Sequence, residues 1–135
     1  MTIVLLLLVI LFGILVMGLV GWFGKKNFGG QRQKHYHQKW LELLTRVKTP
    51  EGMILAVIDA DKLLDEALRS KHYRGKTTGE RLVAAQRLLS DNDAVWYAHK
   101  LRNRLVHEPS IKLKKREAQN ALAGFRQALK DLGAL

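Results

Sequence analysis

The strongest constraint on this chain is its first segment, an unbroken apolar run from Ile3 to Phe23. All 21 residues are apolar or glycine, and a helix of that length, rising 1.5 Å per residue, crosses a hydrocarbon core of about 30 Å. The alternative is a cleaved secretory signal. A signal fits poorly because no Lys or Arg precedes the run and no small-x-small cleavage site follows it. The run is also longer than the apolar region of a signal peptide. We therefore predict a single transmembrane anchor over residues 1–24.

The flanks of the run predict its orientation. The N-terminal side offers only the α-amine, whereas basic residues follow directly on the other side: Lys25, Lys26, Arg32, Lys34 and Lys39. Segments rich in Lys and Arg next to a membrane span stay on the cytoplasmic side. We therefore expect the N-terminus outside the cell, the span in the cell membrane and the rest of the chain in the cytoplasm.

The remainder of the chain is strongly basic. The formal net charge is +11, and every charged side chain follows Phe23, with excess at 25–48, 69–76 and 112–116. This balance favours anionic partners, either lipid headgroups or nucleic acid phosphates, and charge alone does not choose between them. The absence of cysteine excludes disulfides and thiolate metal sites. The core of so short a domain is modest, so dimerisation would help it.

Residues 25–48 form the second predicted segment, a basic juxtamembrane amphipathic helix after a glycine-containing joint at 24–30. Its apolar stripe has helical spacing and consists of Tyr36, Trp40, Leu43, Leu44 and Val47. The stripe either packs on the folded domain or lies on the bilayer, with Lys34 and Lys39 near acidic lipids. We favour packing.

Residues 49–135 form the third segment, in which helix start and stop signals predict four helices. These run from Pro50 to Ser70 after the N-cap Thr49, from the Thr77/Glu80 capping box to Leu89, from about Ala94 to His107 before Pro109, and through a last helix ending at Gly133. The second of them is expected to bury Leu82, Ala85, Leu88 and Leu89. No strand pattern occurs, so the fold class is all-α, an antiparallel bundle of four to five helices behind the anchor.

The helix ending at His107 carries the most informative side chains. Because successive residues of a helix are 100° apart, one narrow arc of this helix contains Val95, His99, Arg102 and Val106. Asn103 and His107 flank that arc. A face that packing would fill with aliphatics thus holds several polar groups, which are costly to bury without partners. Asp61 interrupts the apolar face of the helix from Pro50, so we expect it near Arg102. Asp65 is a second candidate, and a water-filled groove or a second subunit are alternatives.

Two interpretations of these residues stay open: a structural pairing inside the core, or a functional site. The sequence Arg102-Asn103-Arg104-Leu105-Val106-His107 resembles the R-polar-x3-H signature of the HEPN superfamily. Residues 60–65, 73–80 and 95–101 also resemble HEPN-like bacterial proteins that are often membrane-anchored, so the similarity covers about residues 50–130.

The resemblance implies a HEPN-like fold and a metal-independent endoribonuclease without a cofactor, acting as a homodimer through the helix that bears the motif. His107 would take the proton from a ribose 2′-OH or position it, Arg102 would neutralise the phosphate, and Asn103 would orient one of them. Asp61, Asp65 and His99 would support these residues. The products would be a 2′,3′-cyclic phosphate and a 5′-OH. In one toxin branch of the superfamily, a tyrosine two residues after the motif histidine is a target of nucleotide modification. This chain has Pro109 at that place, so we do not expect regulation of that kind.

Two further clusters were weighed. The basic loop offers RNA-binding candidates, with a base stacking on the aromatic ring: Lys71, Tyr73, Arg74 and Lys76. A solvated basic loop is the alternative. His35 and His37 point to different sides of a helix, so no metal site is predicted. The functional hypotheses are RNA cleavage or binding by Arg102, Asn103 and His107, or alternatively a non-enzymatic, dimerising scaffold module at the cytoplasmic membrane face.

Overall fold

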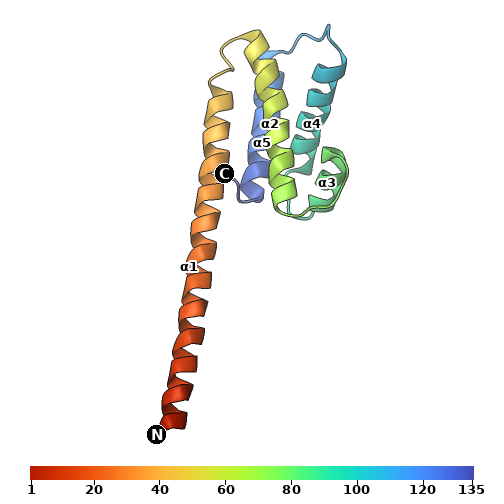
Figure 1. Cartoon of the computed structure of the whole chain (residues 1–135). Helices are drawn as coiled ribbons and strands as arrows, with labels where there is room; N and C mark the ends of the chain where they lie inside the picture. Colours follow the sequence, from red (N-terminus) through yellow and green to blue (C-terminus); the bar gives the residue numbers. More distant parts are fainter. The chain divides into compact units, whose positions relative to one another are not determined.

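Helices joined by short connections make up the part of the chain that the structure, a computed structural model, describes, namely residues 1–23 and 29–135 (Figure 1). The helices are α1 (Thr2–Leu44), α2 (Pro50–Ser70), α3 (Thr78–Ala85), α4 (Asn92–His107) and α5 (Lys115–Asp131). No strand occurs among the described residues, which confirms the all-α prediction. The chain divides into two compact units, Met1–Lys34 and His35–Leu135.

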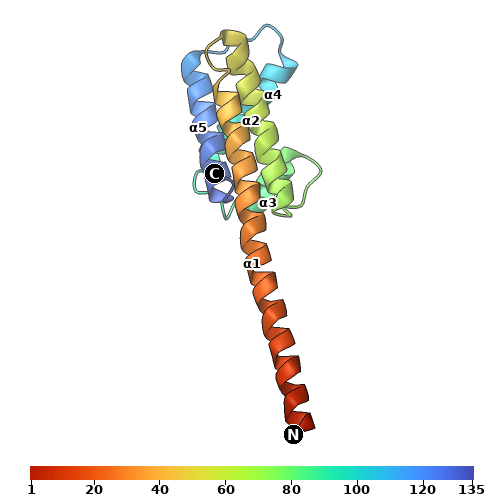
Figure 2. The same cartoon turned by 60° about the vertical axis from the view of Figure 1, so that its left-hand side comes forward.

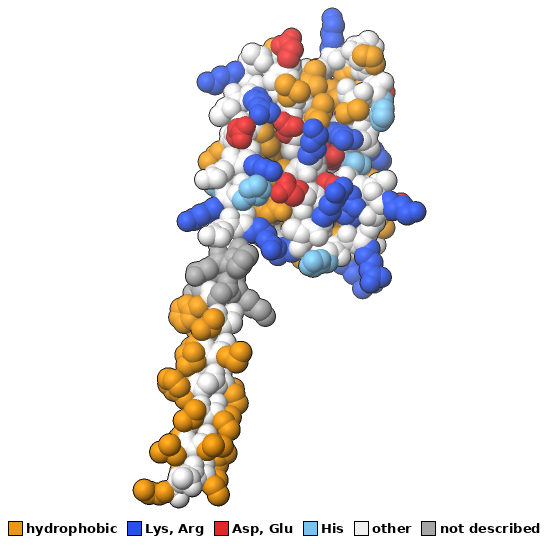
Figure 3. Space-filling view, in the orientation of Figure 1, with side chains coloured by type: hydrophobic (Ala, Val, Ile, Leu, Met, Phe, Trp, Pro, Cys, Tyr) orange, Lys and Arg blue, Asp and Glu red, His pale blue; other side chains and the backbone are white. Residues whose placement is uncertain are grey.

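The first unit is dominated by the apolar segment. Residues Thr2–Phe23 have a mean hydropathy of 3.4, none of them is buried, and the segment is long and apolar enough to cross a membrane. Figure 3 shows its hydrophobic side chains exposed along the helix. The predicted joint at 24–30 falls mostly on residues 24–28, whose side chains lie outside the described residues. Gly29 and Gly30 belong to α1.

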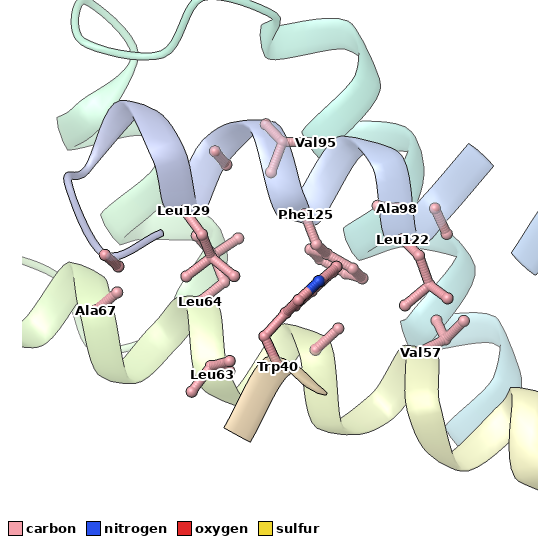
Figure 4. Packing of buried hydrophobic residues seen from close by; sticks show 14 of the residues in the cluster. Trp40, Val57, Leu63, Leu64, Ala67, Val95, Ala98, Leu122, Phe125 and Leu129 are labelled. Atoms are coloured by element: carbon pink, nitrogen blue, oxygen red, sulfur yellow. The ribbon is translucent and has the colours of Figure 1, made fainter. Parts of the chain in front are cut away.

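The second unit is built around three long helices. In Figure 1, α2 and α5 run in the same direction, α4 lies beside them and runs in the opposite direction, and the short α3 lies next to the start of α4. The largest apolar side chains of the core that are less than 2% exposed come from these helices and from α3: Val57, Leu64, Leu68, Leu82, Val95, Phe125 and Leu129. Figure 4 shows how the residues of α2 and α5 face one another across this core.

The end of α1 belongs to the same unit. Tyr36, Trp40 and Leu43 are only 3–4% exposed, and Trp40 joins the cluster that contains Phe125 (Figure 4). The Tyr36 hydroxyl donates to the Ser70 hydroxyl of α2 at 3.3 Å. Figure 2 shows this part of α1 between α2 and α5. Three residues of the stripe, Tyr36, Trp40 and Leu43, therefore pack on the domain, as the sequence favoured, whereas Leu44 is 36% exposed.

Local sequence explains where the helices start and how closely they approach. The Thr49 hydroxyl accepts from the Gly52 amide at 3.0 Å and caps α2. Thr77 accepts from the Glu80 amide at 3.2 Å and caps α3, but the Glu80 carboxylate accepts from the Lys76 amide instead of completing the predicted capping box. At Gly124, an added Cβ would lie 2.5 Å from the Ala94 carbonyl oxygen, so glycine is what lets α5 approach the start of α4.

The predicted third helix is too long. It ends at Ala85, and the chain then turns, because the Asn92 side-chain amide takes up the carbonyl groups of Gln86 and Leu89 at 3.0 and 3.2 Å. Leu89 is buried, but Leu88 is 46% exposed, so its predicted burial was wrong. Leu88 and Leu89 follow the end of the helix, so the helical period that predicted burial of both no longer applies to them.

Candidate functional site

A polar groove opens between α2, the start of α3 and α4. Its volume is about 600 Å³, and we call it the polar groove. It is lined by Asp61, Lys62, Asp65, Arg69, Lys76, Thr77, Thr78, Gly79, Arg81, His99, Arg102 and Asn103. Five of these side chains are cationic and two are carboxylates, so the groove favours an anionic ligand.

The floor of the groove is a buried acid–histidine pair. Asp61 of α2 is 1% exposed and His99 of α4 is 8% exposed. The Asp61 Oδ1 atom lies 2.7 Å from His99 Nδ1. Since a carboxylate only accepts, Nδ1 carries the hydrogen and the ring is held with Nε2 away from Asp61. The acid that interrupts the apolar face of α2 thus orients a histidine of α4.

The hydrogen bonds continue along α4. The Asn103 amide Nδ2 donates to His99 Nε2 at 3.4 Å, and Asn103 Oδ1 accepts from Arg102 Nη1 at 2.9 Å. One assignment satisfies every bond in this series: Nε2 of His99 acts as the acceptor, and the Asn103 amide bridges the histidine to the guanidinium. An imidazole nitrogen that can accept a proton and an arginine therefore stand side by side in the groove, bridged by Asn103.

Arg102 is balanced by Asp61 and yet retains donors. Its Nε lies 3.3 Å from Asp61 Oδ2, which confirms the expected proximity of the two residues. The distance is that of an ion pair, but the angles do not make a hydrogen bond, and Nε is buried without a hydrogen-bonding partner in the described structure. The side chain is 26% exposed. Its Nη2 makes no hydrogen bond to the described residues, so the guanidinium can still bind an anion from the groove.

Asp65 organises the other wall. Its Oδ1 accepts from Arg81 Nε at 2.7 Å and from the Thr78 hydroxyl at 3.0 Å, while Oδ2 lies 2.8 Å from Arg69 Nη2. Burial by itself would raise the pKa of Asp65. The hydrogen bonds from Arg81 and Thr78 and the nearby arginine charges outweigh it, and the pKa lies below its ordinary value of 3.8.

Arg81 is the residue of this wall that the sequence did not single out. It is 5% exposed and also donates through Nη1 to the Gly75 carbonyl, which ties the basic loop to α3. A signal was present, because Arg81 and the buried Ala85 are four residues apart and share one helical face. An arginine on a buried face indicates a carboxylate partner.

His107 lies apart from the groove. It is the last residue of α4, it is exposed, and it does not line the groove. Eight residues separate it from His99, about 12 Å along the helix axis. The core side of α4 is formed by Val95, Ala98 and Leu101, whereas Val106 is 47% exposed, so the predicted inward arc was wrong at that position. Within one copy of the chain, the groove contains Arg102 and Asn103 together with His99.

The candidate RNA-binding loop divides in a similar way. Lys76 lines the groove, and Lys71 and Arg74 are exposed outside it. Tyr73 is partly buried and packs against the core, so its ring is engaged by the domain itself. Its amide also donates to the Leu68 carbonyl at 3.1 Å, which holds the loop at the end of α2.

The two histidines of the juxtamembrane segment are likewise separated. His35 Nε2 lies 3.0 Å from the Glu66 carboxylate, and His37 lines a different groove, next to Trp40. Within residues 1–23 and 29–135, no group of three or more His, Cys, Asp or Glu side chains gathers in a way that could hold a metal ion.

No protein-family model matches the chain, and neither a curated protein nor a solved structure matches it. The interpretation of the site therefore depends on its own geometry.

Proposed function

We propose that this chain is a membrane-anchored, HEPN-like helical domain that binds RNA in the polar groove and cleaves it without a metal ion. The observation that carries the proposal is the series of contacts from Asp61 through His99 and Asn103 to Arg102, which pairs an oriented imidazole with a guanidinium in a cationic groove. An imidazole can act as the general base, and a guanidinium can bind the phosphate, in internal cleavage of a ribose phosphate.

In this proposal the nucleophile belongs to the substrate. His99 Nε2 takes the proton from a ribose 2′-OH, and the Asp61 carboxylate, 2.7 Å from Nδ1, stabilises the imidazolium that forms. The 2′-oxygen then bonds to phosphorus, and the bond from phosphorus to the 5′-oxygen breaks. The 5′-oxygen takes a proton from water in the open groove. The products are a 2′,3′-cyclic phosphate and a 5′-OH end.

The cations of the groove bind the phosphate. Arg102 offers its free Nη2 donors to the charge that gathers on the phosphoryl oxygens, and Lys62 and Lys76 attract the flanking backbone. Asn103 already contacts both His99 and Arg102, so its amide orients the 2′-OH once substrate displaces the 3.4 Å contact with Nε2.

The family resemblance gives the proton transfer to His107 instead. That role requires the α4 helices of two copies to face each other, so that the His107 of each copy completes a cleft. Val106, which precedes His107 on α4 and is 47% exposed, provides apolar surface for such a homodimer. Separate substitutions of His99 and His107 distinguish the two assignments.

Membrane anchoring is part of the same proposal. It is supported by an apolar helix with no buried residue, followed by a strongly basic chain. The chain contains no cysteine, so single cysteines at Thr2 and at the exposed Gln127 near the C-terminus are unique labelling sites. A membrane-impermeant thiol reagent added to intact cells should label only position 2. Labelling at position 127, or a purified chain that begins after Phe23, contradicts the anchor or its orientation.

Cleavage is tested with the full chain and total RNA in EDTA. His99→Ala should lower the rate by about 10² to 10⁴-fold, as loss of a general base does, and Arg102→Ala by a comparable factor. His37→Ala, outside the groove, is the matched control. The new 5′ ends should accept phosphate from a kinase without prior phosphatase treatment.

The outcomes separate the alternatives. Loss of activity in His107→Ala with full activity in His99→Ala transfers the base to His107 and to a dimer. Cleavage that disappears in EDTA contradicts the metal-independent mechanism. A wild-type chain that cleaves no RNA, but sediments as a dimer, supports the non-enzymatic scaffold module.

A further inference from the structure

A second groove, lined mainly by apolar side chains, lies between the end of α1 and α5. Its volume is about 560 Å³, within the range of small-molecule sites, and we call it the apolar groove. Trp40, Leu41 and Leu44 of α1 form one wall, and Ala118 and Leu122 of α5 form the other. All of these residues belong to the unit His35–Leu135.

The walls combine a buried floor with an exposed rim. Trp40 is 4% exposed and Leu122 8%, so both are fixed by the core, whereas Leu41 is 53% exposed and Leu44 36%. Apolar side chains that line a concave surface and stay open to water mark a place where an apolar ligand gains affinity by covering them.

The charges around the apolar groove all have the same sign. Lys115, Arg126 and Lys130 of α5 line it, and no Asp or Glu side chain does. None of the three takes part in an ion pair with the residues that the structure describes. The arginines of the polar groove, in contrast, are each within 3.3 Å of a carboxylate oxygen.

The three cations are unevenly spaced along the groove. Arg126 and Lys130 are four residues apart and are therefore neighbours on the surface of α5. Lys115 lies eleven residues before Arg126, about 16 Å along the helix axis, which is the length scale of an extended acyl chain. The groove thus offers a cationic pair at one end of an apolar channel.

We propose that the apolar groove binds an anionic single-chain lipid, with its headgroup at Arg126 and Lys130 and its acyl chain along Trp40, Leu41 and Leu44. The chemistry recognised is a carboxylate or phosphate joined to one hydrocarbon tail, and the bilayer that the Thr2–Phe23 segment is proposed to enter is its source. The site is separate from the polar groove, so it does not depend on RNA cleavage.

Tryptophan fluorescence tests the proposal, because Trp40 lines the groove and the chain has three tryptophans. The full chain is placed in phosphatidylcholine nanodiscs with Trp22→Phe and Trp96→Phe, which leaves Trp40 alone. A dibrominated stearic acid should quench its emission saturably. A variant that retains Trp96 alone, with Trp22→Phe and Trp40→Phe, reports quenching that does not require the apolar groove and should show no saturable phase.

Charge reversal supplies the matched control. Arg126→Glu with Lys130→Glu should weaken binding by about tenfold or more, as loss of hydrogen bonds to a charged group does. Lys114→Glu with Arg116→Glu changes the net charge equally at exposed positions that do not line the groove, and should leave binding unchanged. The dibrominated alcohol of the same chain length should bind as weakly as the first pair of variants.

Three results would overturn the proposal. The first is the absence of saturable quenching of Trp40. The second is an equal loss in both charge-reversal pairs, which indicates attraction to the whole basic protein. The third is a Trp40 emission that changes with protein concentration and not with lipid, because this makes a second copy of the chain the occupant.

Discussion

The polar groove and the apolar groove lie on the same small helical unit and use their cations in opposite ways. In the polar groove, Asp61 and Asp65 neutralise arginines through ion pairs of 2.7–3.3 Å, and Asp61 fixes a histidine through a contact of 2.7 Å. In the apolar groove, Arg126 and Lys130 stand beside exposed leucines without any carboxylate. Figure 3 shows Lys and Arg side chains with Asp and Glu interspersed on one face of this unit.

The difference teaches what each surface is suited to. Buried hydrogen bonds to charged groups hold side chains in one geometry, which reaction and selective recognition require. An apolar surface with flexible cations at its end adapts to ligands of varied shape and contributes affinity rather than precise orientation. Substitutions on the two floors and rims should therefore have different consequences.

The largest effect is expected at the floor of the apolar groove. Trp40→Ala removes a side chain that is 4% exposed and packs in the cluster with Phe125. The lost burial and the cavity should lower the free energy of unfolding by about 3 to 5 kcal/mol. Chemical denaturation monitored by circular dichroism measures this. A change below about 1 kcal/mol would mean that the end of α1 is not part of the folded unit.

The floor of the polar groove should be almost as sensitive. Asp61→Asn leaves His99 and Arg102 without their shared carboxylate, and breaking a buried pair costs about 3 to 5 kcal/mol. Since Arg102 is 26% exposed and partly screened, we expect about 3 kcal/mol, the lower end of that range. An unchanged melting temperature would refute the pairing. Asp93→Asn, also an acid-to-amide change and near the start of α4, is the control.

The close approach of α5 to the start of α4 comes next. Gly124→Ala places a Cβ 2.5 Å from the Ala94 carbonyl oxygen, and the helices must move apart. Such overpacking typically costs about 1 to 3 kcal/mol. Gly79→Ala is the matched control, because its added Cβ meets nothing closer than 3.6 Å. Equal stability of the two variants would contradict the close approach.

Acid should weaken the wall of the polar groove that Asp65 organises. The pKa of Asp65 is lowered on folding, so its contribution to stability is present above its ordinary pKa of 3.8 and is lost as the pH falls through the lower, folded value. Asp65→Asn should therefore lose less stability than the wild type on acidification below about pH 4, although Glu66 and Asp131 keep part of the dependence. Parallel pH profiles of the two proteins would contradict this assignment.

The smallest effect is expected at the rim of the apolar groove. Leu41 is 53% exposed, so Leu41→Gln should change the free energy of unfolding by less than about 0.5 kcal/mol. The same substitution should weaken the proposed lipid binding, because it removes apolar surface from the channel. A large loss of stability would show that Leu41 belongs to the core, and the contrast between floor and rim would then fail.

Local signals predicted most of the secondary structure. The hydroxyl of Thr49, the proline after it and the cap at Thr77 act within one turn of chain, so they could be recognised from neighbouring residues alone. The end of α3 could not, because it depends on Asn92 reaching back to two carbonyl groups. The buried side of α4 also differs from the predicted one, because Leu101 is buried and Val106 is exposed. The neighbouring helices determine which part of a face with mixed polar and apolar residues is buried.

By itself, the sequence determined the apolar segment from Ile3 to Phe23, the all-helical class and the proximity of Asp61 to Arg102, because hydropathy, helical period and the cost of an unpaired buried charge are local or pairwise constraints. Only the tertiary structure decided that His99, and not His107, shares a groove with Arg102, and that Arg81 completes its wall. It also created the apolar groove, whose walls come from helices seventy residues apart in the chain. Such sites arise from the angles and distances between packed helices, which no single segment encodes.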